Sequence, residues 1–229
     1  MGGVRVSRQL TALVLLVVVA GLSACSTAAS RQSEEMKKLQ ARAAYERSWG
    51  HIEKKEASAA LAAINEAISL DGTVPVYWNA LGWIYLQLGR PDLALGPFNK
   101  SVELDATYAE ALANVGVAQA EMGRWEEALA AYRKAAALPT LSRPHTVYQN
   151  MGVALMNLKR YREAEEALRF AISLEPKLEA AYYNLGLILV AEQRPDEAKA
   201  AFRRARDLSP QSPFGAAATE RLRALGEGG

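Results

Sequence analysis

The side chains that could carry out chemistry in this chain are few and widely separated. Cys25 is the only cysteine of the 229 residues, and His51 and His145 are the only histidines. A thiol can act as a nucleophile, a metal ligand or an attachment point for lipid, but catalysis and metal binding need partners at a matching spacing. Neither histidine falls in a metal-site or catalytic-triad pattern. The sequence therefore predicts no enzyme, no metal site and no cofactor.

The charged residues also point away from catalysis. Glu126–Glu127 and the group at 163–166 stand beside Lys and Arg at helical spacing, which is typical of a solvated helix face with ion pairs. Arg5 and Arg8 account for the formal net charge of +2, and the rest of the chain is neutral. A neutral chain without a glycine-rich phosphate loop favours neither nucleic acid nor a small-molecule substrate as a ligand.

The segment before Cys25 has the pattern of a targeting signal. Two arginines precede an apolar run over 10–22, and small residues follow it, as in a secretory signal peptide. The motif Leu-Ser-Ala-Cys at 22–25 resembles the lipobox of bacterial lipoproteins. The resemblance implies a signal peptide over 1–24 and covalent lipid, of the palmitate type, on Cys25. Ser26, in place of an aspartate, implies sorting to the outer membrane, with the protein on its periplasmic face.

Two other interpretations of the N-terminus remain open. The uncharged interval over 9–30 could serve as an uncleaved membrane anchor, and Cys25 could be a chance free cysteine. Residues 25–40 are small and polar and then charged, without an apolar period, which predicts a lipidated flexible linker.

The remaining sequence is a repeat. One small-residue column, Ser48, Gly82, Gly116, Gly152 and Gly186, has spacings of 34, 34, 36 and 34 residues. Twelve residues further along, every unit has an alanine: Ala60, Ala94, Ala128, Ala164 and Ala198. Four residues later, every unit has a large residue: Ile64, Phe98, Tyr132, Leu168 and Phe202. A 34-residue period with these columns resembles the tetratricopeptide repeat, in which each unit is a pair of antiparallel helices.

The resemblance implies an all-α fold: a right-handed superhelical solenoid of about five helix pairs plus a C-terminal capping helix. The predicted repeats are 41–74, 75–108, 109–142, 145–178 and 179–212. A capping helix and tail follow over 213–229, and four side chains of this segment are expected to be buried: Phe214, Ala217, Leu222 and Leu225. Gly96–Pro97 lies inside a second helix, which predicts a kink or break there.

In the tetratricopeptide family the first helix of each unit lines the concave face, which implies a partner-binding groove. The residues expected in it form an apolar stripe across all five units: Tyr45, Trp49, Ile52, Trp83, Leu86, Val117, Ala120, Val153, Met156, Tyr183, Leu187 and Val190. Asn79, Gln149 and Asn157 are its expected polar members. Arg42 is the only basic residue in these columns, which disfavours the carboxylate clamp of chaperone-binding relatives. The alternative is that neighbouring units bury the stripe as core.

The junction between the third and fourth units carries a narrower resemblance. Its sequence, LPTLSRPHTVYQNMGVAL, contains the two residues that lengthen the spacing to 36. A lipidated repeat protein with this stretch resembles the pilotins of type IV pili, of the PilF, PilW and Tgl type. The resemblance implies that the partner is the pilus secretin, whose outer-membrane localisation and multimer assembly the protein promotes. A general periplasmic adaptor lipoprotein that scaffolds cell-wall enzymes is the alternative, and the signal segment disfavours a cytoplasmic co-chaperone.

Overall fold

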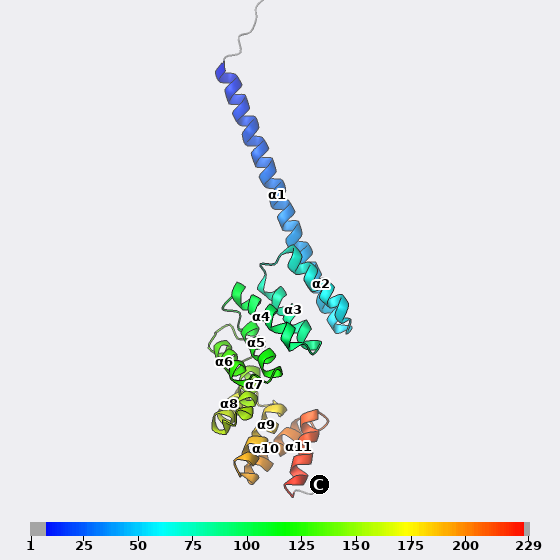
Figure 1. Ribbon diagram of the computed structural model, residues 1–229, viewed down its shortest axis with the longest axis vertical. Helices are drawn as coiled ribbons and strands as arrows, with labels where there is room; N and C mark the ends of the chain where they lie inside the picture. The colour runs from blue at the N-terminus through cyan, green and yellow to red at the C-terminus, as the bar shows by residue number, and fades with distance from the viewer. Residues whose placement is uncertain (1–7, 227–229) are drawn as a thin grey trace, which may run out of the picture. The chain divides into compact units, whose positions relative to one another are not determined.

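The computed structural model describes the backbone of residues 8–226 and the side chains of residues 30–226 (Figure 1). Within that part the secondary structure is entirely helical, which confirms the predicted all-α fold. The chain divides into two compact units, Met1–Gly72 and Thr73–Gly229, and each is described by itself below.

The first unit is a pair of helices, α1 (Arg8–Glu53) and α2 (Ala57–Leu70). Small residues form their interface, including Ala44 and the column residue Ser48, both fully buried. Residues 25–40, expected to be a flexible linker, are instead part of α1. The physical reason is composition: Arg, Gln, Glu, Met, Lys and Leu dominate 31–40 and are good helix formers. A weak i,i+3 pair also links Glu35 and Lys38 at 3.9 Å.

The side chains of the targeting segment lie outside the described part of the structure. Residues 1–7 are not described, and neither are the side chains of 8–29, among them the thiol of Cys25. The signal peptide and the lipidation of Cys25 therefore stay predictions. Of the helices in the described part, none combines the length and the apolar character that crossing a membrane requires.

The second unit is a run of helix pairs that ends in one extra helix. Its helices are α3 (Pro75–Gln87), α4 (Pro91–Leu104), α5 (Ala109–Glu121), α6 (Trp125–Ala136), α7 (Pro144–Asn157), α8 (Tyr161–Leu174), α9 (Glu179–Ala191), α10 (Pro195–Leu208) and α11 (Pro213–Ala224). Helices α3 and α4, α5 and α6, α7 and α8, and α9 and α10 pack as pairs, and each pair packs on the next. Pro91 and Pro195 stand at the starts of α4 and α10, where the missing N–H is tolerated.

The glycine column marks the point where the two helices of each pair cross. A Cβ atom added to Gly116 would lie 2.5 Å from the Tyr132 ring, and one added to Gly186 would lie 2.5 Å from the Phe202 ring. Both rings are almost fully buried. The glycine column and the large-residue column therefore pack against each other, and each large side chain fills the space that the glycine leaves open.

The loop between α6 and α7, in the stretch that contains the two extra residues, is anchored by side-chain hydrogen bonds. Thr140 Oγ1 donates to the carbonyl oxygen of Thr107 at 2.6 Å, and Ser142 Oγ donates to Glu110 Oε1 at 2.6 Å. Partial burial would raise the pKa of Glu110, but the hydrogen bonds from Ser142 outweigh it and hold that pKa below its usual value. These hydrogen bonds therefore connect the α6–α7 loop to the segment between α4 and α5 and to the start of α5.

Helix α4 corrects one expectation. It runs without interruption from Pro91 to Leu104 with Pro97 inside it, so of the kink or break predicted at Gly96–Pro97 the break is wrong. Ala94 and Phe98 are fully buried on either side of the proline, and their packing holds both halves of the helix in place. Gly96 faces open space, because a Cβ added there would meet no atom within 4 Å.

Helix α11 caps the unit as predicted, but with a different set of buried residues. Leu222 is buried as expected, whereas Phe214 is 37% exposed and Ala217 and Leu225 are half-buried. Gly215 and Ala218 are buried with Leu222. These three share one face of a helix at spacings of three and four, and Phe214 is rotated about 100° from that face.

Candidate functional site: the inner groove

The first helices of successive pairs in the second unit, α3, α5, α7 and α9, contact one another and so form one face. The crossing glycine of each helix points toward the second helix of its own pair. The next residue is rotated by about 100° and therefore lies on the face that the first helices share. We call this surface the inner groove and define it by these residues: Trp83, Leu86, Val117, Ala120, Val153, Met156, Tyr183, Leu187 and Val190.

Side chains of the inner groove are neither core nor fully exposed. All are half-buried except Val190, which is 42% exposed. Trp83 and Leu86 pack against the buried cluster of Ala94, Phe98 and Ala118, and most of the others pack on the larger buried cluster of the later pairs. Most of these side chains thus rest on the core and keep an outer edge accessible, so neighbouring residues bury part of the stripe, and partner binding by its accessible part stays a prediction.

A hollow of about 440 Å³ lies in this groove between α5 and α7. Val117 and Ala120 come from α5, Val153 comes from α7, and Trp125 and Tyr132 of α6 also line it. Burial raises the pKa of Tyr132, so its hydroxyl stays neutral. The structure therefore brings three expected groove residues together in one cavity. The hollow also includes Trp125, the first residue of α6, which was not among the expected groove residues.

Asparagine side chains form a second column on this face. Asn114, Asn150 and Asn184 each stand two residues before a crossing glycine. Asn114 Nδ2 donates to Asn79 Oδ1 at 2.9 Å, and Asn79 Nδ2 donates to the Tyr108 hydroxyl at 3.3 Å. Within residues 30–226, the amides of Asn150 and Asn184 have no hydrogen-bond partner. An amide offers both donors and an acceptor, which suits the backbone of an extended peptide.

The polar members expected from the sequence were only partly correct. Asn79 belongs to the amide pair, but Asn157 is exposed and donates to the Val153 carbonyl of its own helix at 2.9 Å. Gln149 is half-buried, and it is the neighbouring Asn150 that lines the hollow. The glycine column was the signal that could have located Asn150, because the same offset gives an asparagine in three consecutive repeats.

Three expected groove residues belong to the first unit. Tyr45, Trp49 and Ile52 lie half-buried on α1, and the Tyr45 and Trp49 rings meet edge to face at 6.2 Å. Arg42 Nε donates to Glu46 Oε1 at 2.9 Å, so the one basic residue of the expected columns is paired within its own helix. The structure thus describes a small aromatic surface here without a free cationic clamp in those columns.

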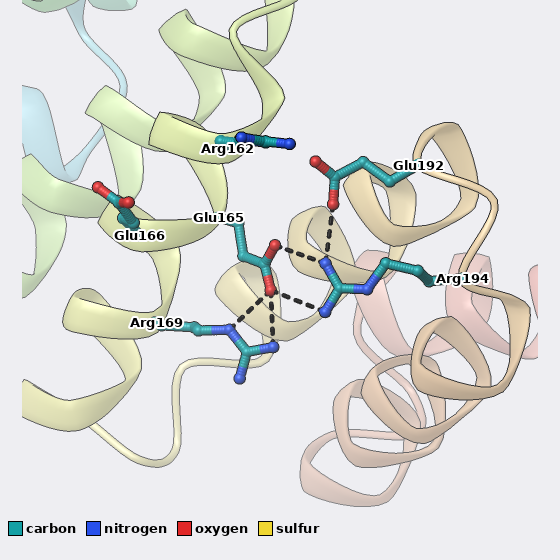
Figure 2. A pocket seen from close by; sticks show the side chains of 6 residues that line it. All are labelled: Arg162, Glu165, Glu166, Arg169, Glu192 and Arg194. Atoms are coloured by element: carbon teal, nitrogen blue, oxygen red, sulfur yellow. Dashed lines mark hydrogen bonds and ion pairs between the residues drawn. The ribbon is translucent and has the colours of Figure 1, made fainter.

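A second hollow, of about 720 Å³, lies between α8 and the start of α10 (Figure 2). Glu165, whose side chain is 14% exposed, is ion-paired with Arg194 at 2.7 Å and with Arg169 at 2.7 Å. Arg194 is also paired with Glu192 and Glu197, both at 2.8 Å. The hydrogen bond from Arg194 lowers the pKa of Glu165, and these carboxylates together raise the pKa of Arg194.

We call this second cavity the ionic hollow. Its central charges satisfy one another across two successive helix pairs, so it acts as a tie between them. In the described part of the chain, no group of three His, Cys, Asp or Glu side chains could hold a metal ion.

Comparison with known families agrees with this architecture. Two models described as tetratricopeptide repeat match the chain, one over residues 45–109 and 150–213 and the other over 111–144. No curated protein sequence matches it significantly.

Solved structures share the fold over most of the chain. A crystal structure of MamA is 25% identical, with a TM-score of 0.64, and the match covers 75% of this chain and 93% of MamA. PilW, titled a widely conserved type IV pilus biogenesis factor, is 20% identical, with a TM-score of 0.74 and coverage of 82% and 86%. PilF of Pseudomonas aeruginosa is 18% identical, with a TM-score of 0.71 and coverage of 84% and 95%.

Proposed function

We propose that this chain, which belongs to the tetratricopeptide repeat family, is an outer-membrane lipoprotein of the pilotin type. Lipid on Cys25 anchors it to the periplasmic face of the membrane, and the repeats bind the secretin of a type IV pilus machine. Its function is then to bring the secretin to the outer membrane and to promote assembly of the multimer. Tetratricopeptide repeats mediate interactions between proteins, and the partner class follows from that.

The inner groove is the observation that carries this proposal. It presents half-buried apolar side chains on four successive first helices, together with the partnerless amides of Asn150 and Asn184. Apolar contacts can hold alternate side chains of a bound segment, and amides can hold its backbone, so an amphipathic helix or an extended strand fits. The likeness in fold to PilW and PilF supports the choice of a pilus component as the partner.

The anchor and the groove combine into one mechanism. Two or three acyl chains contribute about 0.8 kcal/mol per buried methylene, which makes release from the membrane very slow. A secretin subunit held in the groove would then share the lipoprotein's membrane address. Confinement to one membrane plane raises the effective concentration of bound subunits, which favours ring assembly without any new contact between them.

Metabolic labelling with a fatty acid tests the anchor. The wild-type chain should incorporate the label and fractionate with the outer membrane. Cys25→Ala should lose the label and accumulate as an unprocessed or soluble product. A wild-type protein that takes up no label would show that the lipid anchor is wrong.

Paired substitutions in the second predicted repeat test the groove. Trp83→Glu with Leu86→Glu should reduce secretin recovered from solubilised outer membrane more than tenfold, and should lower the amount of secretin multimer. Leu93→Glu is the matched control, since Leu93 is 41% exposed on α4; it should leave capture unchanged. A circular dichroism melt of each variant separates lost binding from unfolding.

Three outcomes of this experiment count against the proposal. Normal multimer levels with a folded Trp83→Glu, Leu86→Glu variant would place the secretin elsewhere. Unfolding of that variant alone would show that the two side chains serve as core. Recovery of cell-wall enzymes in place of secretin by the wild-type protein would favour the general adaptor.

A further inference from the structure

A third hollow, of about 390 Å³, lies on the other side of the helix pairs, between α6 and α8 with α7 behind it. Its apolar lining includes Tyr148 and Met151 of α7 and Phe170 of α8. The side chains of Arg133, Glu163 and Glu166 form a charged rim. We call this cavity the outer notch.

Phe170 breaks the pattern of its own column. The residue eighteen positions after the crossing column is charged in every other repeat: Glu66, Lys100, Lys134 and Arg204. Phe170 occupies that solvent-facing position in the fourth predicted repeat and is 46% exposed. Since four repeats fold with a charge here, the helix pair itself does not require an aromatic ring at this point.

The next repeat provides an internal comparison for the outer notch. Tyr182 occupies the same position as Tyr148, four residues before the crossing glycine, and the Arg204 guanidinium lies 5.8 Å from the centre of the Tyr182 ring. In the outer notch the cation is replaced by Phe170, whose ring meets Tyr148 edge-on at 4.4 Å. In the fifth predicted repeat an arginine thus covers the tyrosine ring, whereas in the fourth a second aromatic ring lies against it beside an open cavity.

One carboxylate of the outer-notch rim, Glu166, has no ion-pair partner among the described residues. Arg160 and Arg133 both pair with Glu163, at 2.6 Å and 3.3 Å. Among the described residues, no basic side chain is ion-paired with Glu166, and Figure 2 shows it apart from the bonded group around Glu165. A bound segment that brings a basic residue to Glu166 would complete this rim.

We propose that the outer notch is a second docking site, separate from the inner groove, for a protein segment of defined chemistry. The segment places one aromatic or long aliphatic side chain in the cavity that Tyr148, Met151 and Phe170 line, and an adjacent Lys or Arg against Glu166. Aromatic side chains in a desolvated pocket beside a charge pair are the usual anchors of such contacts. With both surfaces occupied, the protein links two chains, or two segments of one partner, whatever binds in the inner groove.

Fluorine NMR of the full chain in detergent, with a fluorine label on the Phe170 ring, tests the proposal directly. Three blocked peptides serve as probes: acetyl-Ser-Phe-Arg-Ser-amide and its variants with Phe replaced by Ala or Arg replaced by Glu. The first peptide should shift the signal saturably. Each of the others should bind at least fivefold more weakly. Equal shifts with all three peptides, or no shift with any, would overturn the proposal.

Two protein variants, tested by isothermal titration with the same peptides, keep the result interpretable. Phe170→Lys restores the residue type of the other repeats and should melt like the wild type while losing binding of the first peptide. Glu166→Gln should weaken that peptide at least threefold, and Glu127→Gln on α6 should not. Unchanged binding in both notch variants would contradict the site. Sedimentation that shows a dimer for the wild type and a monomer for Phe170→Lys would identify a second copy as the occupant and overturn the proposal.

Discussion

The inner groove and the ionic hollow are formed by the same kind of helix pair, yet they treat polar groups in opposite ways. In the groove the amides of Asn150 and Asn184 have no partner in the described part of the chain. In the ionic hollow Arg194 is ion-paired with three carboxylates within 2.8 Å. A ligand could therefore form hydrogen bonds with the groove amides. The charged groups of the ionic hollow are already paired with one another and join two helix pairs.

This difference has a geometric origin in the crossing of the helices. The first helix of each pair lies close to its second helix where glycine admits a large side chain, and the face beside that glycine carries the apolar residues of the inner groove. Second helices carry charges at outward positions, where long Arg and Glu side chains can reach from one pair to the next. The apolar residues available for binding thus lie on one face, and the ion pairs that join helix pairs lie on another. Substitutions can test this separation.

Gly116→Ala should have the largest effect on stability. Its added Cβ would lie 2.5 Å from the buried Tyr132 ring, and overpacking of a core site costs typically 1–3 kcal/mol. We expect a loss of about 3 kcal/mol, at the upper end, because a buried ring has little room to move. Urea unfolding followed by circular dichroism measures it. A variant as stable as the wild type would show that this crossing is loosely packed.

Glu165→Gln should have an intermediate effect that depends on pH. Hydrogen bonds to charged partners contribute roughly 1–3 kcal/mol, and exposed ion pairs less than about 1 kcal/mol. Glu165 is largely buried and Arg194 is about one-third exposed, so we expect a loss of about 1 kcal/mol at pH 7. Glu166→Gln, next to it on α8 and without an ion-pair partner among the described residues, is the control and should change little.

The sign of the pH dependence follows from the lowered pKa of Glu165. A carboxylate with a lower pKa in the folded state stabilises the fold above its unfolded value of 4.5. This contribution is lost as the pH falls through the folded pKa. The difference in unfolding free energy between the wild type and Glu165→Gln should therefore be constant from pH 7 to about pH 5 and shrink below pH 4.5. A difference that grows toward acid would contradict this assignment.

The sequence predicted the parts of the fold that depend on columns. Glycine and large-residue columns located the helix crossings, because close packing restricts residue type at each repeat. The helical state of residues 25–40 and the continuity of α4 through Pro97 were not predicted, since local propensity and tertiary packing decide those segments and leave no periodic signal. Phe214 was misplaced by one position, a rotation of about 100° that apolar character alone does not reveal.

The candidate site was predictable only in its apolar part. Val117 and Val153 follow the glycine column, were expected on one shared face, and line the same hollow. Trp125 lies on the second helix of its pair and lines the same hollow. Its position there depends on how two helix pairs stack, which the sequence of one repeat does not indicate. Phe170 carried a signal that could have been found: an aromatic in a column of charges.

Gly96→Ala should give the smallest effect and one of opposite sign to Gly116→Ala. Gly96 lies in the interior of α4 on its exposed side, and an added Cβ would meet no atom within 4 Å. Glycine in a helix interior is less favourable than alanine by about 0.5–1 kcal/mol, so the variant should be more stable by that amount. The same urea titration measures it, and Pro97 is left unchanged so that only backbone freedom differs. If Gly96→Ala instead lowers stability, then the glycine accommodates the Pro97 ring within a continuous α4. The two glycines would in that case serve structural needs on both faces, and the contrast between a crowded crossing and an open outer surface would not hold for this repeat.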